Sequence, residues 1–369
     1  MSCPRIEIDL SKIHHNTLTV VGQLKGHGID VTGVTKAVCG HPAIARAMLN
    51  GGVKNLAEAR LSNLRRLRKA GVTCPITLIR SPMLSQANDV VHFCETSYNT
   101  ERAVIAALAA AAIQQGKVHG IILMVEMGDL REGIMPQDLG AMAQHVVDMP
   151  GVALKGIGAN FACLSGTAPD AAKMRAFSIL ANDIEGMCGP FIQTVSGGNS
   201  ANLPWAFGGH ATGRINDLRL GEALLLGCDP VSGNHIAGLH RDAFTLVAEV
   251  IETDRKAVRP PASVANPALA RLSLVPTCTQ QRLILALGHQ DTDIFGLSMP
   301  PGHGLIGATS DHLVIGDDHS KLKVGSEVRF HMNYSALMRA MAAPDVATNL
   351  CVDRTALPEQ GRHKHLALV

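Results

Sequence analysis

The 369-residue sequence predicts an α/β protein in which a (β/α)8 barrel is followed by a smaller, mainly β C-terminal domain. Three observations favour this fold class. The chain is long enough for two domains, short apolar runs alternate with helix-like stretches up to Cys228, and closely spaced strand-like runs follow. We expect residues 1–235 to form the barrel and residues 236–369 the second domain, to whose sheet residues 5–10 can add a strand.

Eight strand-like runs precede the end of the predicted barrel, which is the number that closes a (β/α)8 fold. They are residues 31–36, 53–57, 76–80, 90–94, 121–127, 154–161, 192–198 and 215–221. The stretches between them have helix signals. In HPAIARAMLNGG, for example, Pro42 lies near the start and Gly51 follows the end, as is typical of helices.

The pattern of apolar and polar residues changes after the predicted barrel. Short apolar runs are now separated by Gly, Pro, Asp and His, which indicates an all-β unit. These runs are residues 244–253, 282–288, 312–316 and 327–332. Residues 259–271 are expected to form a surface loop and residues 353–369 a polar tail.

The composition restricts the class of function. Hydrophobic residues make up 46% of the chain and charged residues 17%, so the chain can bury a core and is not disordered as a whole. The net charge is +2 and the basic residues are scattered, which favours small-molecule partners over nucleic acid or membranes.

The apolar run at 103–113 is too short to span a bilayer and no secretory signal is present, so we expect a cytoplasmic protein. The 9 cysteines include no CxxC pair and are expected to be reduced and mostly buried.

Lys36 is the first candidate for chemistry. It ends the run VTGVTK, and barrel enzymes place their reactive groups at the C-terminal ends of strands. Desolvation there lowers the pKa of a lysine and makes the neutral amine available for a Schiff base or for proton transfer. Taken alone, a lysine at this position is more often one whose ammonium reaches solvent at the barrel rim.

Two glycine-containing turns follow the seventh and eighth runs. SGGNSANLP at 196–204 contains Asn199 and Ser200, and RLGEALLLG at 219–227 contains Gly221. Phosphate sites in this fold use the loops after strands 7 and 8. One such turn is usually only a turn, but two of them opposite a strand-end lysine predict a phosphate site.

Two arginines complete the pattern. Arg131 follows the fifth run, and Arg219 lies inside the eighth, where a charge is costly unless it is paired or contacts a ligand. Arg219 is therefore expected to face a ligand. An ion pair with Asp217 or Glu222 is the structural alternative.

In order and spacing, GVTKAVCG, VEMGDLREGI, GIGANFAC, SGGNSA and LRLGEALLLG resemble motifs of the alanine racemase-like family of pyridoxal-phosphate enzymes, over most of the chain. The resemblance implies pyridoxal 5'-phosphate as cofactor. It makes Lys36 the Schiff-base lysine, places Arg131 at the phenolic oxygen and places Arg219 at the pyridine nitrogen. The cofactor-binding residues that it implies are Lys36, Arg131, Asn160, Asn199, Ser200, Arg219, Gly221 and Glu222, with Asn160 replacing a family histidine.

The resemblance also implies a reaction. An arginine at the pyridine nitrogen keeps the nitrogen unprotonated, which favours racemisation over side reactions. Lys36 would be one base, and the family takes the second base, a tyrosine, from the other subunit of a dimer. Here His289, in LGHQDTD, occupies the tyrosine position, and an imidazole has a pKa near working pH. Asp291, Asp311 and His312 are the other candidates for this base.

The acidic replacement resembles the ornithine-racemase-like branch of the family. Asp291, Asp293 and Asp311 could pair with the distal ammonium of ornithine or lysine, or they could only shape turns. In AAPDV at 342–346, Asp345 stands where that branch tends to have a tyrosine, and a carboxylate cannot donate a hydrogen bond to a phosphate.

The leading hypothesis is therefore a cytoplasmic, homodimeric, pyridoxal-phosphate-dependent amino-acid racemase, an isomerase that uses two bases at Cα. A non-catalytic pyridoxal-phosphate-binding protein would resemble the barrel alone, and this chain has about 140 further residues. A metal-assisted D-amino-acid aldolase could use His289, Asp291, Asp311 and His312 as ligands. Their spacing matches no recognised metal motif, and we predict no metal site.

Overall fold

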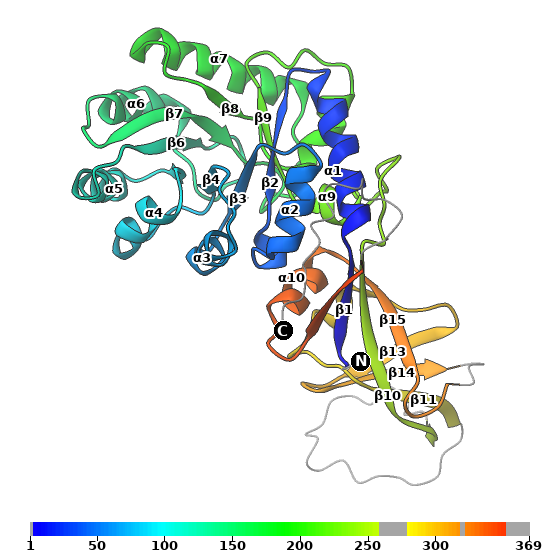
Figure 1. Ribbon diagram of the computed structural model, residues 1–369. Helices are drawn as coiled ribbons and strands as arrows, with labels where there is room; N and C mark the ends of the chain where they lie inside the picture. Colours follow the sequence, from blue (N-terminus) through cyan, green and yellow to red (C-terminus); the bar gives the residue numbers. More distant parts are fainter. Residues whose placement is uncertain (1–2, 258–278, 318–321, 352–369) are drawn as a thin grey trace, which may run out of the picture.

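The computed structural model describes residues 3–257, 279–317 and 322–351 (Figure 1). Its eight-stranded parallel barrel and its separate antiparallel sheet confirm the predicted fold class. In Figure 1 the barrel occupies the upper part of the view and the second sheet the lower part, with helix α10 (Tyr334–Ala342) between them.

The barrel strands follow one another in chain order, and the last one closes onto the first. They are β2 (Asp30–Val34), β3 (Asn55–Glu58), β4 (Ile76–Leu78), β5 (Thr96–Asn99), β6 (His119–Val125), β7 (Val152–Ala159), β8 (Thr194–Ser196) and β9 (Asp217–Leu220). All seven residues of β6 are buried, as expected for a strand covered by helices outside and by side chains inside.

One predicted strand is wrong. Residues 90–94 belong mostly to helix α4 (Ala87–Phe93), and the fourth barrel strand is β5. Val90 and Val91 are buried, whereas Asn88 and His92, four residues apart, are exposed on one face of the helix. Packing of this helix on the barrel thus overrides the β propensity of the two valines.

Helices cover the outside of the barrel (Figure 1). Besides α4 they are α1 (Leu10–Lys25), α2 (Pro42–Asn50), α3 (Leu61–Lys69), α5 (Arg102–Gln114), α6 (Leu139–Val147), α7 (Ala171–Cys188), α8 (Leu203–Phe207) and α9 (Glu222–Leu226). Short 3-10 turns lie at η1 (Lys36–Val38), η2 (Leu84–Gln86), η3 (Pro136–Asp138), η4 (Ser200–Asn202) and η5 (Ile294–Gly296). Asp9 starts α1 by accepting the N–H groups of Ser11 and Lys12.

The second sheet has the strand order β12-β15-β10-β11-β14-β13, and β1 pairs with both β10 and β16. Its strands are β1 (Arg5–Asp9), β10 (Phe244–Ala257), β11 (Thr279–Ala286), β12 (Leu297–Ser298), β13 (His303–Ala308), β14 (His312–Asp317), β15 (Glu327–Met332) and β16 (Ala347–Cys351). The four predicted runs are strands, whereas β12, β13, β16 and α10 were not predicted.

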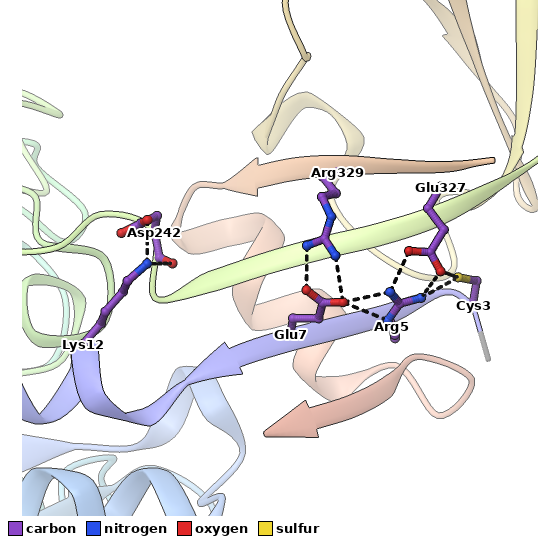
Figure 2. Close-up of polar contacts among 7 residues, drawn as sticks. All are labelled: Cys3, Arg5, Glu7, Lys12, Asp242, Glu327 and Arg329. Atoms are coloured by element: carbon purple, nitrogen blue, oxygen red, sulfur yellow. Dashed lines mark hydrogen bonds and ion pairs between the residues drawn. The ribbon is translucent and has the colours of Figure 1, made fainter. Parts of the chain in front are cut away.

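The N-terminal strand is held in the second sheet by ion pairs that cross β10 (Figure 2). Arg5 donates to both carboxylate oxygens of Glu327, at 2.7 and 2.8 Å, and to Glu7 at 2.8 Å. Arg329 donates to Glu7 at 2.6 Å. Because β1 leads directly into α1, this network attaches the start of the barrel to the C-terminal domain.

Three other expectations have mixed outcomes. The described cysteines are all free, but only Cys94 and Cys188 are buried, so the expectation of mostly buried thiols is wrong. The predicted loop at 259–271 and the polar tail at 353–369 lie outside the described residues. Within the described ranges, no helix combines the length and the apolar character needed to cross a membrane.

Candidate active site at the mouth of the barrel

A cavity of about 740 Å³ lies where the barrel strands end. All of the predicted cofactor-binding residues line it: Lys36, Arg131, Asn160, Asn199, Ser200, Arg219, Gly221 and Glu222. They come from loops far apart in the sequence. The closed barrel brings them together because the C-terminal ends of parallel strands share one face.

Lys36 follows β2 at the start of η1, and its side chain is half-buried. Burial lowers the pKa of its ammonium, and the positive charges of Arg131 and Arg219 lower it further, while Cys163 acts in the opposite direction. The side chain of Lys36 forms no hydrogen bond or ion pair with the described residues. Its amine is thus available for chemistry at a lower pH than an ordinary lysine.

Arg219 is buried on β9, with an exposed fraction of 4%. Its Nη1 donates to Ser196 Oγ at 2.6 Å and to Tyr98 OH at 3.2 Å. Its Nη2 donates to Ala159 O at 2.7 Å and to Asn160 Oδ1 at 2.6 Å. All four acceptors are uncharged, so neither direct ion pair that we considered for Arg219 is formed.

A buried carboxylate lies behind Arg219. Ser196 Oγ donates to Asp217, and Thr32 Oγ1 donates to the other oxygen of Asp217 at 2.6 Å. Burial raises the pKa of Asp217, while the hydrogen bonds and the charge of Arg219 lower it. Ser196 therefore links the guanidinium to the carboxyl group of Asp217, and this chain of contacts fixes the orientation of Arg219.

The predicted phosphate loops also meet in the cavity. Asn199 caps η4 by accepting Ala201 N at 2.8 Å and donates to Phe161 O at 2.8 Å, which ties the loops after β7 and β8 together. Ser200 Oγ accepts Ala223 N at 3.2 Å. A Cβ at Gly221 would lie 3.3 Å from Val34, so glycine keeps this wall open.

Glu222 lines the same end of the cavity. Burial raises the pKa of its carboxyl group to about 7, and Asp229 contributes, while Lys36 lowers it. Near neutral pH this group is therefore partly protonated. The sequence predicted Glu222 as a cofactor-binding residue, and the raised pKa of its side chain is an addition from the structure.

Arg131 is an exposed residue that is already paired. Its Nε and Nη2 donate to the two carboxylate oxygens of Glu132, at 2.5 and 2.7 Å. Asn160 stands in place of the family's histidine, and its side-chain oxygen accepts a hydrogen bond from Arg219. Both residues line the cavity, and each has a partner inside the chain.

The candidates for the second base are not among the residues that line this cavity. His289 is exposed on the C-terminal domain, and its ring lies 6.3 Å from that of Phe295. Asp291 accepts the N–H of Gly288 at 2.8 Å, and Asp311 is exposed. The structure therefore groups the barrel residues in one site and leaves these side chains on another surface of the chain.

Two tyrosines that were not predicted as site residues lie at the site. Tyr98 is buried below Arg219, whose guanidinium carbon is 4.8 Å from the ring centre. Gly158 allows this packing, because a Cβ there would come within 2.5 Å of the Tyr98 ring. Tyr334, at the start of α10, lines the cavity, and burial raises the pKa of its phenol. No motif predicted either position, although they are the chain's only 2 tyrosines.

The residues present fit pyridoxal phosphate. The cavity offers an unpaired lysine amine, a loop with Ser200 for a phosphate, and Arg219, whose Nε–H has no partner among the described residues. The residues do not fit a metal: in the described ranges no group of three or more His, Cys, Asp and Glu side chains could hold an ion. The proposed ligands of the aldolase alternative therefore form no metal centre within one chain.

Comparison with known proteins identifies the family. A family model described as the N-terminal domain of alanine racemase matches residues 8–229. This chain belongs to the alanine racemase family, as the motifs predicted. A lysine racemase from Thermotoga maritima is 34% identical over 94% of this chain and 98% of its own length. An ornithine racemase from Acetoanaerobium sticklandii is 31% identical over 94% of this chain and 99% of its own length.

Solved structures show the same fold at lower identity. Alanine racemase from a D-cycloserine-producing Streptomyces lavendulae has a TM-score of 0.76, with 18% identity over 95% of this chain and 98% of that chain. D-threonine aldolase from Filomicrobium marinum has a TM-score of 0.71, with 16% identity over 92% of this chain and 88% of that chain. The fold alone therefore accommodates more than one reaction.

Proposed function

We propose that this protein is a pyridoxal-phosphate-dependent racemase of a basic amino acid such as lysine or ornithine. The observation that carries the proposal is the convergence of Lys36, Arg219 and Ser200 on one cavity. Full-length similarity to a lysine racemase and an ornithine racemase supports the reaction and the substrate class. When bound, pyridoxal phosphate supplies a ring that accepts the electron pair left when the substrate Cα loses its proton.

Lys36 is the residue that would anchor the cofactor and then exchange a proton with Cα on one face. Its depressed pKa favours the neutral amine, which is the form that can take up a proton.

Arg219 would face the pyridine nitrogen. A guanidinium has N–H donors and no acceptor, so a nitrogen that lies against it must be unprotonated. The contacts of Nη1 and Nη2 leave only Nε–H free in the described residues, and they hold that edge in one direction. Arg219 thus keeps the ring a moderate electron acceptor, which suits racemisation.

Ser200, Asn199 and the backbone at Gly221 and Glu222 would hold the phosphate. Tyr334 adds a donor, because its raised pKa keeps the phenol protonated at neutral pH. Asp345 is exposed on the C-terminal domain and cannot supply this donor as a carboxylate. We therefore assign to Tyr334 a hydrogen bond that the sequence analysis could not place.

The second base would come from a second copy of the chain. His289 is our candidate, with Asp291, Asp311 and His312 as alternatives. Phe295, beside His289, is 81% exposed, and Leu130 and Leu164 near the cavity are 76% and 65% exposed. Large apolar side chains exposed at both places are typical of an interface, which supports a homodimer with shared sites. We also propose the cytoplasm as its location.

The proposal is tested with the purified protein. The wild type should show a visible absorption band from bound cofactor that borohydride abolishes, and it should convert L-lysine or L-ornithine into the D form on chiral chromatography. Lys36→Ala should lack both properties, and the control Lys54→Ala, an exposed substitution, should keep both. Chelation should leave the activity unchanged. Loss of activity on chelation, or a band retained by Lys36→Ala, would refute the assignment.

A further inference from the structure

Two arginines that no motif predicted line the cavity on the side away from the phosphate loops. Arg60 follows β3 and Arg80 follows β4. In a closed barrel of eight strands, each strand faces the one four places away, so β4 lies opposite β8 and β3 opposite β7. Arg80 thus faces the Ser200 loop across the cavity, and Arg60 faces the Asn160 loop.

The two arginines are neighbours in register. Glu58 of β3 pairs with Leu78 of β4, and Ile79 N donates to Glu58 O at 2.9 Å. Arg60 and Arg80 each come two residues after this pair, on strands whose backbones lie about 4.8 Å apart. Like charges side by side repel one another, so this arrangement is stable only when water or an anion screens the two guanidinium groups.

Neither guanidinium is neutralised by the described part of the chain. Arg60 and Arg80 are exposed, and no hydrogen bond or ion pair of their side chains is formed there. The other two arginines at the cavity are engaged, since Arg131 pairs with Glu132 and Arg219 contacts four acceptors. Ser81, next to Arg80, adds a buried hydroxyl without a partner in the described residues.

A smaller cavity of about 300 Å³ adjoins the same wall. Arg60, Arg80 and Ser81 line both cavities. Arg65 lines only the smaller one, and its guanidinium pairs with Asp89 at 2.6 Å. The unpaired donors are therefore concentrated on the wall that the larger cavity shares, and the adjoining arginine has its own counter-ion.

From this geometry we infer that Arg60 and Arg80 form the binding site for the α-carboxylate of the amino-acid substrate. The inference rests on the proposed function and names a part of the substrate that the proposed function leaves without a partner. Lys36 follows β2, the strand next to β3, so a substrate with its Cα at the lysine amine has its carboxylate within reach of Arg60. Two guanidinium forks match the two oxygens of a carboxylate.

The assignment also orients the substrate. With Lys36, Arg60 and Arg80 at the carboxylate end, a distal ammonium is repelled from this wall. The distal ammonium must therefore extend out of the barrel, toward the C-terminal domain of the second copy that we propose. The side chains of Asp291 and Asp311, on the C-terminal domain of a second copy, carry the charge that such an ammonium needs.

Equilibrium spectral titration of the cofactor-loaded protein tests the inference. The probes are L-ornithine and 1,4-diaminobutane, which share their amines and differ by the carboxylate. Arg60→Gln and Arg80→Gln should each weaken ornithine binding by about 10-fold, and the double variant by about 100-fold. None should weaken the binding of 1,4-diaminobutane, because that probe has no carboxylate and the two arginines repel its distal ammonium. Arg65→Gln is the matched control and should change neither.

The outcomes separate this inference from the proposed function. An absence of a visible band or of D product with the wild type would refute the proposed function. If the wild type has both and the arginine variants bind ornithine as the wild type does, the carboxylate site is wrong. Equal weakening of both probes would assign a structural role to the arginines and also overturn the inference. Arg60→Lys and Arg80→Lys, which keep the charge, should bind ornithine with intermediate affinity.

Discussion

The barrel mouth and the outer face of the C-terminal domain differ in how complete they are within one chain. At the mouth, Lys36 and Arg219 lie in one cavity, and Arg219 is held by four hydrogen bonds. On the C-terminal domain, His289 is exposed beside Phe295, whose side chain is 81% exposed. Folding of one chain assembles the first region, whereas the exposed apolar side chain of the second region is typical of an interface.

This difference indicates which groups of the proposed active site one chain supplies and which it does not. Folding of one chain places the groups that would hold the cofactor and remove the first proton. In the proposed function, the group that acts on the opposite face comes from a second copy. Substitutions in the barrel should therefore change cofactor binding or folding, while substitutions at His289 should change catalysis alone.

The largest expected effect in this comparison is that of His289→Asn. Loss of a general base should reduce racemisation by roughly 10²- to 10⁴-fold. The cofactor band should be unchanged, because His289 does not line the cavity. Chiral chromatography measures the rate, and His331→Asn, an exposed histidine on β15, is the control. An unaffected rate would transfer the role to Asp291, Asp311 or His312.

Asp217→Asn tests the barrel site, which is assembled within one chain. The substitution removes the counter-charge that Ser196 links to the buried Arg219 and should reduce the free energy of unfolding by about 3 kcal/mol. Urea unfolding of the cofactor-free protein measures it. Asp30→Asn, at an exposed carboxylate paired with Lys54, should cost little. Equal stability of the Asp217→Asn variant and the wild type would show that Arg219 needs no counter-ion.

Glu222 should make the stability of the cofactor-free barrel depend on pH. Its folded pKa of about 7 lies above the ordinary value of 4.5, so the folded state holds this proton to a higher pH than the unfolded state does. Stability from this group is present at pH 4 and is lost as the pH rises to about 7.

Glu222→Gln removes the carboxyl group and with it the loss of stability between pH 4 and pH 7. Relative to the wild type, the variant should gain on the order of 2 kcal/mol of unfolding free energy between pH 5 and pH 8. Urea unfolding at the two pH values provides the measurement. A constant difference between the two proteins would contradict the raised pKa.

Tyr334→Phe has the smallest expected effect. It removes one hydroxyl from the cavity and should weaken binding of pyridoxal phosphate by about 3- to 10-fold, the net value of one ordinary hydrogen bond. Fluorescence or absorbance titration of the cofactor measures this affinity. Met338→Ala, on the exposed face of α10, should leave it unchanged. Unchanged binding by Tyr334→Phe would exclude the phenol as a phosphate donor.

Sequence reasoning was most successful where local pattern and chain order determine position. Lys36, Ser200 and Arg219 each lie at or beside the end of a barrel strand, so counting strands was sufficient to predict that they meet. The run at 90–94 failed because a buried stripe of valines is compatible with a strand or a helix, and only packing decides between them.

The rest of the site depends on tertiary arrangement. Tyr334 reaches the cavity because α10 packs against η1, a contact between residues about 300 positions apart in the chain. Arg60 and Arg80 are neighbours because of the register between β3 and β4, and no sequence motif predicts this register. Ser196 links Arg219 to Asp217 only because β8 and β9 are adjacent in the closed barrel.

The central claim is that one chain's barrel and another chain's C-terminal domain form each active site. Mixing Lys36→Ala with His289→Asn under conditions of subunit exchange tests it most directly. Half of the dimers would be hybrids with one intact site each, so the mixture should recover about a quarter of wild-type racemisation from two inactive parents. If both residues act within the same chain, every site in the hybrid lacks one of them, and a mixture no more active than its parents would contradict the account.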